Sequence, residues 1–582
     1  MPAAERSTRL VRFSVPITML LSAGLLVLSC APQAVSPQDT SGSQQNQKGA
    51  PSTLRIGTRK VPTEGLILFQ GTSVGGPESG VTFHAGLITF NERGEVLPHL
   101  AERIPTIESG DWRVSPDGRM DVVWKLRPNV TWHDGTPLSA EDLVLAMRVL
   151  RDDEVPSVRG RWVSLVMDAV AHDESTLIVT WREPYMLANA MSVSDLPPLP
   201  RHLIANLYEQ GDKQAFVNSP YWTRDFVGVG PYRMGQWDPG SHAEALAFDG
   251  YFLGRPKIDR IIFRYIHDVN TMLANLLAGE LDMITVGSIK GEDVLTIKQA
   301  WEPTSTGTVI ASMHGIRRLW FQFRDPGAPW LRDVRVRRAL VHGLDRQTIV
   351  DTLHHGLTQV ADTLVDTDDP LYQLAEARGL ARYPYDLRRA EQLMAEAGWT
   401  RSASAGYESA GGQRFGIEVR TVGGSPENLR EILAIADLWS SAGFNGDTHL
   451  IPSGTANANE LRAKAEGVFS VPLRNEPEAM GNYISSQISS ERTRWRGSNH
   501  GGYSNPVYDH TYDEYITTLD LPKRQGLLAD LLSLAAEEVI FVPVYYDAST
   551  AYTAFRKGIR GPGRVSASQL ADLWNIQSWE MN

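Results

Sequence analysis

The chain has 582 residues and a formal net charge of −12, with 42% hydrophobic and 21% charged residues, an ordinary balance for a soluble globular protein. This length exceeds what one hydrophobic core usually organises, so it predicts two or three lobes. The acidic balance argues against general binding to nucleic acid or to an anionic membrane surface.

The first thirty residues have the pattern of an export signal. Three arginines precede an apolar stretch at 17–28, which at about a dozen residues is too short for an ordinary membrane span. The stretch leads to Cys30, the only cysteine in the chain. Residues 27–30 resemble the signal of bacterial lipoproteins, so we expect a signal peptide at 1–29 and a lipid on Cys30. A plain secretory signal with an incidental cysteine is the alternative.

Residues 30–52 predict a flexible tether. They are rich in Ser, Gln, Pro and Gly and have almost no apolar content, a composition that does not form a packed core. An exported chain with one cysteine cannot form an internal disulfide. We therefore expect the stability of the folded body to come from burial of apolar side chains.

The stretch 112–150 predicts one compact unit of strands, turns and a helix. A tight turn at 115–118 precedes apolar and polar residues in alternation at 122–127, which is typical of a half-buried strand. A second strand is expected at 130–133, ending at the turn pair Asp134-Gly135.

A helix is predicted after this turn. Ser139 stands at its cap and Asp142 at its third position, which is the pattern of a capping box. The apolar face of the helix is formed by Leu143, Ala146, Met147 and Leu150. His133 beside Asp134 is a candidate catalytic dyad, but adjacent residues on a strand point to opposite faces, so we favour the turn.

The order of these motifs resembles the signature of family 5 solute-binding proteins of ABC importers, which include oligopeptide, dipeptide and nickel receptors. In that family a DG turn, an LR pair, a (F/W)HDG turn and an S/T-A-E-D helix start follow one another. Here the same motifs stand at 117–118, 126–127, 132–135 and 139–142. Further family markers extend the resemblance over nearly the whole chain after the tether.

Other elements follow from local patterns. The stretches 261–266 and 281–284 flank a helix that Asp268 caps, which predicts a βαβ unit and neighbouring parallel strands. Further strands are expected at 54–57, 176–180 and 418–422, and further helices at 201–208, 386–398 and 431–441.

Two local motifs have a structural interpretation. Gly228-x-Gly230 fails as a dinucleotide fingerprint, because Pro231 follows where more of the glycine loop and a helix start are needed. A basic cluster is formed by Arg332, Arg335, Arg337 and Arg338. We predict that this cluster is the solvated side of a helix and not a phosphate site.

The resemblance implies an α/β fold of the periplasmic-binding-protein type (type II, cluster C), with two α/β lobes around a ligand cleft and an extra small α+β lobe. The first lobe is expected from 53–92, 222–318 and 545–582, the extra lobe from 93–221, and the remaining α/β lobe from 319–544. Closure of the two α/β lobes would bury a solute at their interface.

The resemblance also indicates where the solute binds. In peptide-binding members an Asp near a W..D...D(P) segment pairs with the α-amino group of the ligand, but the corresponding stretch here, 467–477, lacks that tryptophan and aspartate. Glu476 could replace the aspartate, and Arg474 could bind a carboxylate or phosphate through its planar fork. The alternative is that both are solvated loop residues. The candidate set also contains aromatic residues that are equally expected in a core, and it comprises Trp320, Gln322, Arg474, Asn475, Glu476 and Tyr503.

Adjacent histidines at 354 and 355 raise the question of a metal, because nickel receptors belong to the resembled family. Together with His342 and His99 they give no compact ligand spacing. We therefore predict no metal and no cofactor.

The predicted function is that of a non-enzymatic extracytoplasmic receptor of an ABC importer. It is expected to be a monomer, held at the membrane by the lipid on Cys30, that delivers peptides or a similar polar solute to a permease and its ATPase. The chain has no P-loop and no H-E-x-x-H motif that would indicate an enzyme. The alternative with the same fold is an extracytoplasmic sensor or chaperone-like peptide binder without an importer.

Overall fold

The computed structural model describes residues 51–59, 76–155, 161–238, 240–313, 315–324, 328–367, 369–402, 406–423, 426–455, 457–476, 478–547, 551–565 and 571–582. The predicted signal peptide, Cys30 and nearly all of the predicted tether lie outside these residues. Residues 51–582 form one unit by their contacts. Within the ranges given above, no helix is long and apolar enough to cross a membrane.

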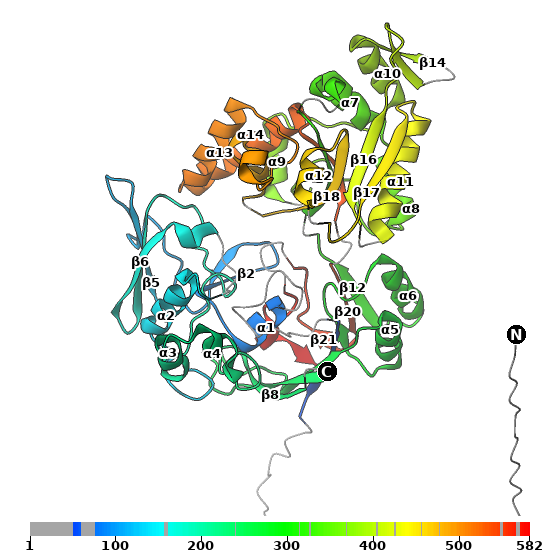
Figure 1. Ribbon diagram of the computed structural model, residues 1–582. Coiled ribbons are helices and arrows are strands. Elements are labelled where there is room, and N and C mark those ends of the chain that lie inside the picture. The colour runs from blue at the N-terminus through cyan, green and yellow to red at the C-terminus, as the bar shows by residue number, and fades with distance from the viewer. Residues whose placement is uncertain are drawn as a thin grey trace, which may run out of the picture. The chain divides into compact units, whose positions relative to one another are not determined.

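A seven-stranded sheet organises the first part of the fold, called here the seven-stranded lobe (Figure 1). Strand β1 (Thr53–Thr58) pairs in parallel with β10 (Arg260–Tyr265) on one side and with β11 (Met283–Ile284) on the other. Helix α5 (Val269–Ala278) connects β10 to β11 and begins at the side-chain cap of Asp268. The predicted βαβ unit is present, but β1 lies between its two strands.

The other strands of this sheet complete the order β12-β20-β11-β1-β10-β9-β8, with β8 (Tyr232–Asp238), β9 (His242–Ala247), β12 (Gly307–Ala311) and β20 (Tyr552–Arg556). The chain also forms α1 (Gly76–Phe83) and α6 (Gly291–Trp301), and two ribbons, β2 (Ile88–Phe90) with β3 (Val96–Pro98) and β21 (Ile559–Arg560) with β22 (Glu580–Met581).

An antiparallel sheet builds the smaller, four-stranded lobe. Its order is β4 (Trp112–Val114), β5 (Met120–Lys125), β7 (Thr176–Trp181) and β6 (Val166–Asp173). Helix α2 (Ala140–Arg151) packs on this sheet and has the predicted capping box, in which Ser139 N–H donates to Asp142 Oδ2 at 2.9 Å. Two further helices follow, α3 (Arg201–Glu209) and α4 (Lys213–Val217).

The predicted strand at 130–133 is wrong. Thr131 makes one isolated bridge with Pro137, and no ladder extends from it in this described stretch. The reason is the turn pair Asp134-Gly135, in which Gly135 has φ 90°. This left-handed conformation suits glycine and reverses the chain too soon for a hairpin of any length.

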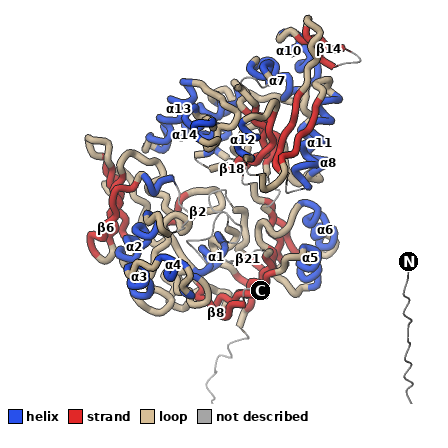
Figure 2. The backbone as a smooth tube through the Cα atoms, viewed as in Figure 1, coloured by secondary structure: helices blue, strands red, loops and turns tan. Residues whose placement is uncertain are grey.

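The five-stranded lobe is built on a sheet of order β17-β16-β18-β13-β19, whose strands are among those drawn red in Figure 2. Strand β13 (Gly315–Phe321) lies between β18 (Val468–Arg474) and β19 (Phe541–Tyr546) and is antiparallel to both. Leu319 and Phe321 enter the apolar cluster on one face of the sheet, and Ile316 and Trp320 enter the cluster on the other. Both faces of β13 are therefore buried.

Helices cover both faces of this sheet (Figure 1). The cluster that contains Leu319 also takes in side chains of α7 (Val334–His342), α8 (Arg346–Leu353), α10 (Leu387–Glu396) and α11 (Pro426–Ser441). The opposite cluster takes in side chains of α9 (Pro370–Ala377), α12 (Ala458–Ala463), α13 (Pro506–Thr517) and α14 (Leu521–Glu537). The remaining strands are β14 (Trp399–Ser402), β15 (Gly406–Ser409), β16 (Ile417–Val422) and β17 (Gly446–Ile451).

Strands β13 and β19 run across the predicted lobe boundaries at 318/319 and 544/545. The chain passes from the seven-stranded to the five-stranded sheet between β12 and β13, and returns between β19 and β20. At the first boundary the difference arises because β13 already contains Arg317 and Arg318, which are both buried, although arginine is rare in a strand covered on both faces.

The prediction that the arginine cluster is the solvated side of a helix is wrong for Arg337, which is 2% exposed. Its Nη1 donates to the carbonyls of Leu331 and Arg332 at 2.7 and 2.9 Å, and its Nε donates to those of Glu538 and Val539, each at 3.1 Å. Arg337 thus ties the start of α7 to the end of α14. The carbonyls beyond α14 are about 200 residues away in sequence, so local spacing cannot reveal them.

Replacing Arg337 by Met should lower the free energy of unfolding by about 2–4 kcal/mol, because buried carbonyls would lose charge-assisted donors. Urea unfolding measures the change. Arg335, an exposed arginine of the same helix, is the matched control, and Arg335→Met should change stability by less than about 0.5 kcal/mol. Equal effects of the two substitutions would contradict the structural role of Arg337.

Candidate functional site

The predicted residues Arg474, Asn475 and Glu476 lie where β18 ends. Arg474 is in register with Gly315, the first residue of β13, so this end of β18 lies beside the passage of the chain between lobes. Arg474 Nη1 is 3.7 Å from Glu476 Oε1, and both side chains are about half exposed. An exposed pair of this kind contributes at most about 1 kcal/mol, so either group can pair with a charged ligand instead.

Trp320 and Tyr503 lie together in a second place, called here the β13 pocket. The Trp320 ring is stacked on that of Phe469, with ring centroids 5.1 Å apart and an interplanar angle of 6°. The Tyr503 ring lies edge-on to that of Phe323, with centroids 5.2 Å apart. The pocket is lined by Arg318, Trp320, Phe321, Phe323, Asn482, Tyr483, Ser498, Asn499, His500, Gly501, Tyr503 and Ile540.

Gln322 is hydrogen-bonded within its own lobe. Its Nε2 donates to Ala463 O at 2.8 Å, and its Oε1 accepts from Arg324 N–H at 3.2 Å. The side chain is 2% exposed. Both ends of the amide are therefore already engaged, in contrast to the exposed charges at the end of β18.

Arg318 lines the β13 pocket and was absent from the predicted set. Its Nη1 donates to the Tyr483 hydroxyl, and its guanidinium carbon lies 5.0 Å from the centroid of that ring. Burial lowers the pKa of Arg318 to about 9, so the side chain still carries its charge at neutral pH. The available signal in the sequence was a pair of adjacent arginines directly before an apolar run.

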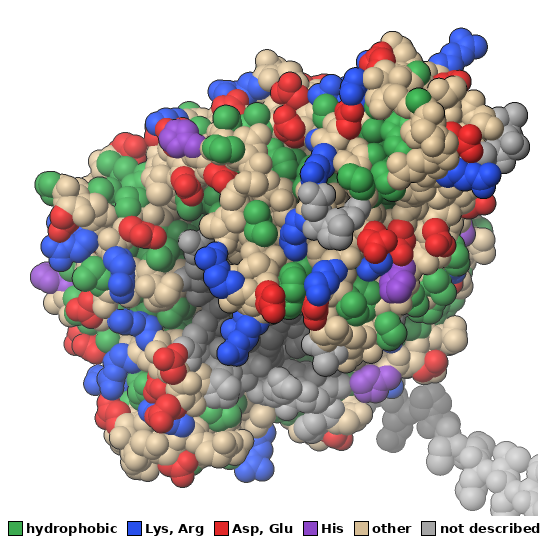
Figure 3. Space-filling model, turned by 45° about the horizontal axis from the view of Figure 1, so that its top comes forward, with side chains coloured by type: hydrophobic (Ala, Val, Ile, Leu, Met, Phe, Trp, Pro, Cys, Tyr) green, Lys and Arg blue, Asp and Glu red, His purple; other side chains and the backbone are tan. Residues whose placement is uncertain are grey.

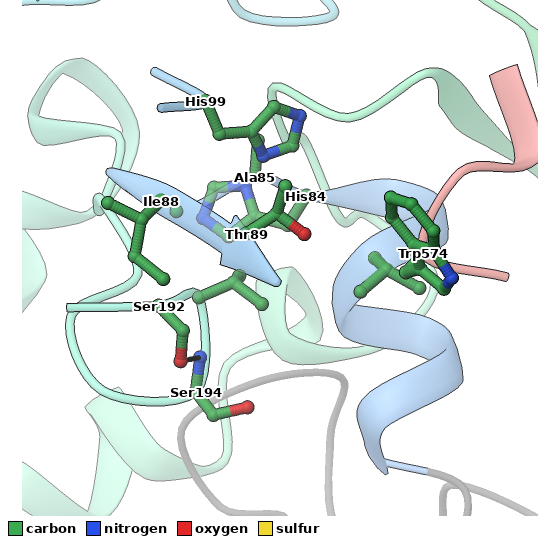
Figure 4. Close-up of a pocket in the computed structure, with 11 residues that line it drawn as sticks. His84, Ala85, Ile88, Thr89, His99, Ser192, Ser194 and Trp574 are labelled. Carbon is green, nitrogen blue, oxygen red and sulfur yellow. Dashed lines mark hydrogen bonds between the residues drawn. The ribbon is translucent and has the colours of Figure 1, made fainter. Parts of the chain in front are cut away.

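A second pocket lies around His84 and His99, with Ile88 on one side and Trp574 on the other (Figure 4). The main-chain N–H of Ser194 donates to Ser192 Oγ at 3.2 Å along its wall. Burial lowers the pKa of His84 to about 3 and that of His99 to about 4, so both rings are neutral at pH 7.

The polar atoms of His84 and His99 have structural partners. His84 Nε2 donates to Pro198 O at 2.8 Å, and its Nδ1 accepts from Val229 N–H at 3.2 Å. His99 Nε2 is 2.9 Å from the Tyr251 hydroxyl. The tautomer of His84 is assigned from this network, because an acceptor at Nδ1 leaves the proton on Nε2.

His133 and Asp134 do not form the catalytic dyad considered from the sequence. Asp134 Oδ2 is 2.7 Å from His202 Nε2. His133 Nδ1 accepts from Gly228 N–H at 3.1 Å, and its Nε2 donates to Gly230 O at 3.0 Å. Burial lowers the pKa of His133 to about 4. Both nitrogens of a neutral ring are thus engaged with the main chain.

The histidines considered for a metal lie in separate places. His342 is the last residue of α7, and its Nδ1 is 2.7 Å from Pro384 O. His354 and His355 follow α8. Among the side chains that the structure describes, no group of three or more His, Cys, Asp or Glu residues is placed to hold a metal ion.

The model of a known protein family, the bacterial extracellular solute-binding proteins of family 5, matches residues 95–473, more than half of the chain. The chain belongs to this family. The membership predicted from the motifs at 117–142 is therefore confirmed.

Relatives of this solute-binding protein carry several names. The oligopeptide-binding protein AppA of Bacillus subtilis is 22% identical over 584 residues, which cover 99% of both chains. The nickel-binding periplasmic protein of Escherichia coli is 23% identical and is matched over 79% of this chain and 83% of its own. A putative ABC transporter peptide-binding protein of Brucella ovis is 24% identical over 54% of this chain, and the match spans 55% of the relative.

Solved structures share the fold. NikA from Brucella suis, in complex with Fe(III)-EDTA, gives a TM-score of 0.71 at 20% identity and is matched over 91% of this chain and all of its own. AppA from Bacillus subtilis, in complex with a nonapeptide, gives 0.62 at 19% identity with the same coverage. The predicted type II periplasmic-binding-protein fold is confirmed.

Replacing His133 by Gln should flatten the pH dependence of stability. The folded-state pKa of about 4 lies below the ordinary value of 6.5, so between these values the unfolded chain takes up a proton that the folded chain does not. Above pH 6.5 the neutral ring does not lower the free energy of unfolding. As the pH drops from 7 to 5, this group lowers the free energy of unfolding by about 2 kcal/mol, because only the unfolded chain is protonated there.

Urea unfolding at pH 7 and 5 tests this expectation. His133→Gln should be less stable than the wild type at pH 7 but should lose about 2 kcal/mol less on acidification. His172, which is exposed, is the matched control, and His172→Gln should keep the wild-type pH dependence. An unchanged dependence in His133→Gln would contradict a buried neutral imidazole.

Proposed function

We propose that this solute-binding protein is the receptor of an ABC importer, which captures peptides or a similar polar solute between its lobes and delivers it to a membrane permease. The main support is the way the lobes are joined. Two short connections, between β12 and β13 and between β19 and β20, link the seven-stranded and five-stranded sheets. Paired crossings of this kind act as a hinge about which two rigid lobes can rotate.

Ion pairs also join the same two lobes. Lys290 Nζ is 2.8 Å from Glu427 Oε1, and Arg430 Nη1 is 3.0 Å from Glu292 Oε1. Lys290 and Glu292 stand at the start of α6, and their partners lie in the first turns of α11. All four side chains are substantially exposed, so each pair contributes at most about 1 kcal/mol. These two pairs therefore add little resistance to a rotation of the lobes.

The surface and the relatives favour a polar solute. One face of the molecule is hollowed, and charged side chains of both signs lie around the rim of the hollow (Figure 3). Several relatives are named for peptide binding. The exposed Arg474 and Glu476 offer a cation and an anion at the end of β18, which suits a solute with charges of both signs, such as a peptide.

The remaining parts of the proposal concern anchoring and partners. Cys30 carries the lipid, the tether at 30–52 separates it from the folded body, and a permease with its ATPase receives the solute. The protein acts as a monomer and catalyses no reaction. The extracellular location given by the family name is compatible with an anchored receptor.

The full chain, purified in mild detergent, should release short peptides when it is denatured. Mass spectrometry of the released material is the measurement. A single sugar or metal chelate would contradict the peptide class while leaving a receptor. An empty chain whose melting temperature no peptide mixture raises would contradict the proposal as a whole.

Replacing Glu476 by Gln should weaken binding of peptides with a free α-amino group by about tenfold, because a charge-assisted hydrogen bond is lost. Peptides with an acetylated amino terminus should bind the variant and the wild type alike. Glu491, an exposed residue of the same lobe, provides the control Glu491→Gln, which should bind as the wild type does. Calorimetric titration distinguishes these results.

Replacing Cys30 by Ser should move the protein from the membrane fraction to the soluble extracytoplasmic fraction and abolish incorporation of labelled fatty acid. Binding of solute by the purified variant should be unchanged, because the anchor precedes the tether. Continued membrane attachment of the Cys30→Ser chain would contradict a lipid at this position.

A further inference from the structure

A buried methionine joins two lobes that the crossings do not connect. Met186 stands in the turn between β7 and α3, within the stretch that belongs to the four-stranded lobe, and it is 1% exposed. Its side chain is buried in the apolar cluster of the five-stranded lobe that also takes in α9, α13 and α14. Leu519, between α13 and α14, packs in the opposite direction, against the cluster that contains Trp181 of β7. The two lobes therefore exchange apolar side chains.

Arg524 adds a polar bond to this exchange. It lies near the start of α14, and its Nη1 donates to the main-chain carbonyls of Met186 at 3.3 Å and of Thr518 at 3.4 Å. One guanidinium thus bonds to both lobes, and hydrogen bonds from a charged donor are stronger than those between neutral groups. The arrangement of Met186, Leu519 and Arg524 is called here the Met186 contact.

The turn that carries Met186 is fixed to the four-stranded lobe. The Tyr185 ring stacks on that of Trp181, with centroids 5.3 Å apart and an interplanar angle of 27°. Asn189 Nδ2 donates to Pro105 O at 3.0 Å on the other side of the turn. Because one lobe holds the turn and another surrounds the Met186 side chain, the turn cannot follow a movement of the five-stranded lobe. Such a movement has to pull Met186 out of the cluster.

The Met186 contact differs in kind from the ion pairs of Lys290 and Arg430. Those pairs are exposed, so water replaces their partners at little cost when the lobes separate. Met186 can leave its cluster only by exposing an apolar side chain to water, which is unfavourable. An unbranched thioether side chain is also adaptable in packing, which suits a contact that has to form again after each separation.

We propose that the Met186 contact is a latch, which holds the receptor closed and has to open before the solute is released. This inference rests on the proposed receptor function and adds a means of regulating the same cleft. Figure 1 shows α13 and α14 on the left of the five-stranded lobe, above the four-stranded lobe, whereas β12 and β20, to which the crossings lead, lie on the right. A rotation about the crossings therefore separates α14 from the turn that carries Met186.

The distance between two spin labels, one in each lobe, tests the latch. The labels are attached at Glu174→Cys, between β6 and β7, and at Asp513→Cys, on α13, both of which are exposed positions. The full chain also carries Cys30→Ser, so that no other cysteine remains. Pulsed electron resonance measures the distance distribution without solute and with short peptides from digested casein. Met186→Ala, Arg524→Met and the double variant are measured beside this reference chain.

Peptides should enrich the population with the shorter distance, in which the lobes are closed. Each substitution should lower the ratio of closed to open chains by about tenfold or more, because a buried side chain or a charge-assisted bond is lost. The double variant should lower it by less than the product of the two single effects, since an open latch has little left to lose.

The outcomes for the latch and for the receptor function are distinct. Distance distributions that are the same in Met186→Ala, in Arg524→Met and in the reference chain would overturn the latch and leave the receptor function standing. A distribution of the reference chain that peptides leave unchanged would contradict peptide capture, and a shift in the two variants would then still support the latch.

Two matched controls separate the latch from stability. Met191→Ala removes a buried methionine of the same stretch, whose side chain lies in the cluster that contains Trp181. It should lower stability and leave the ratio of closed to open chains unchanged. Lys523→Met removes an exposed cation next to Arg524 and should change neither. An equal fall of the ratio in Met191→Ala and Met186→Ala would overturn the assignment to Met186.

Discussion

Two neutral imidazoles hold together the junction between the early part of the chain and the seven-stranded sheet. His133 bonds Gly228 and Gly230, and His84 bonds Val229 between them. The approach is so close that a Cβ at Gly228 would lie 1.9 Å from Phe83 O, and one at Gly230 would lie 2.4 Å from His84 N. The glycines at 228 and 230 are thus required by packing and not by a nucleotide. Protonation of either ring would remove a hydrogen-bond acceptor from this junction. Burial keeps both rings neutral, because it disfavours the charged form of an imidazole.

The local elements of the fold could largely be predicted from the sequence. The capping box of α2 and the Asp268 cap of α5 depend on residues three positions apart, and both are present. The prediction of a strand at 130–133 was wrong, because the local sequence does not indicate how soon a turn reverses the chain. The order of strands in the sheets could not be predicted, since β1 separates β10 from β11 although it precedes both in sequence by about 200 residues.

The buried arginines are the residues whose roles could not be predicted from the sequence. Arg317, Arg318 and Arg337 look alike in a sequence, but their partners are a glutamate, a tyrosine ring and main-chain carbonyls. Each partner lies on another element, so the pairing becomes visible only in the folded chain. Trp320 and Tyr503 could be proposed as site residues because aromatic side chains suit a cleft. Arg318 could not, because only the folded chain shows that its Nε has no hydrogen-bond partner among the described residues.

The position of β20 has a consequence for the order in which the two sheets can form. All strands of the five-stranded sheet lie between residues 315 and 546, so this lobe has all its strands before the chain is finished. The seven-stranded sheet does not, because β20 sits between β11 and β12 and is the strand that pairs with β12. Chains emerge and fold from the amino terminus, so the seven-stranded sheet is completed late, when residues 552–556 enter it. A chain cut short before β20 would have all the strands of the five-stranded sheet but would leave β11 and β12 without the strand that lies between them.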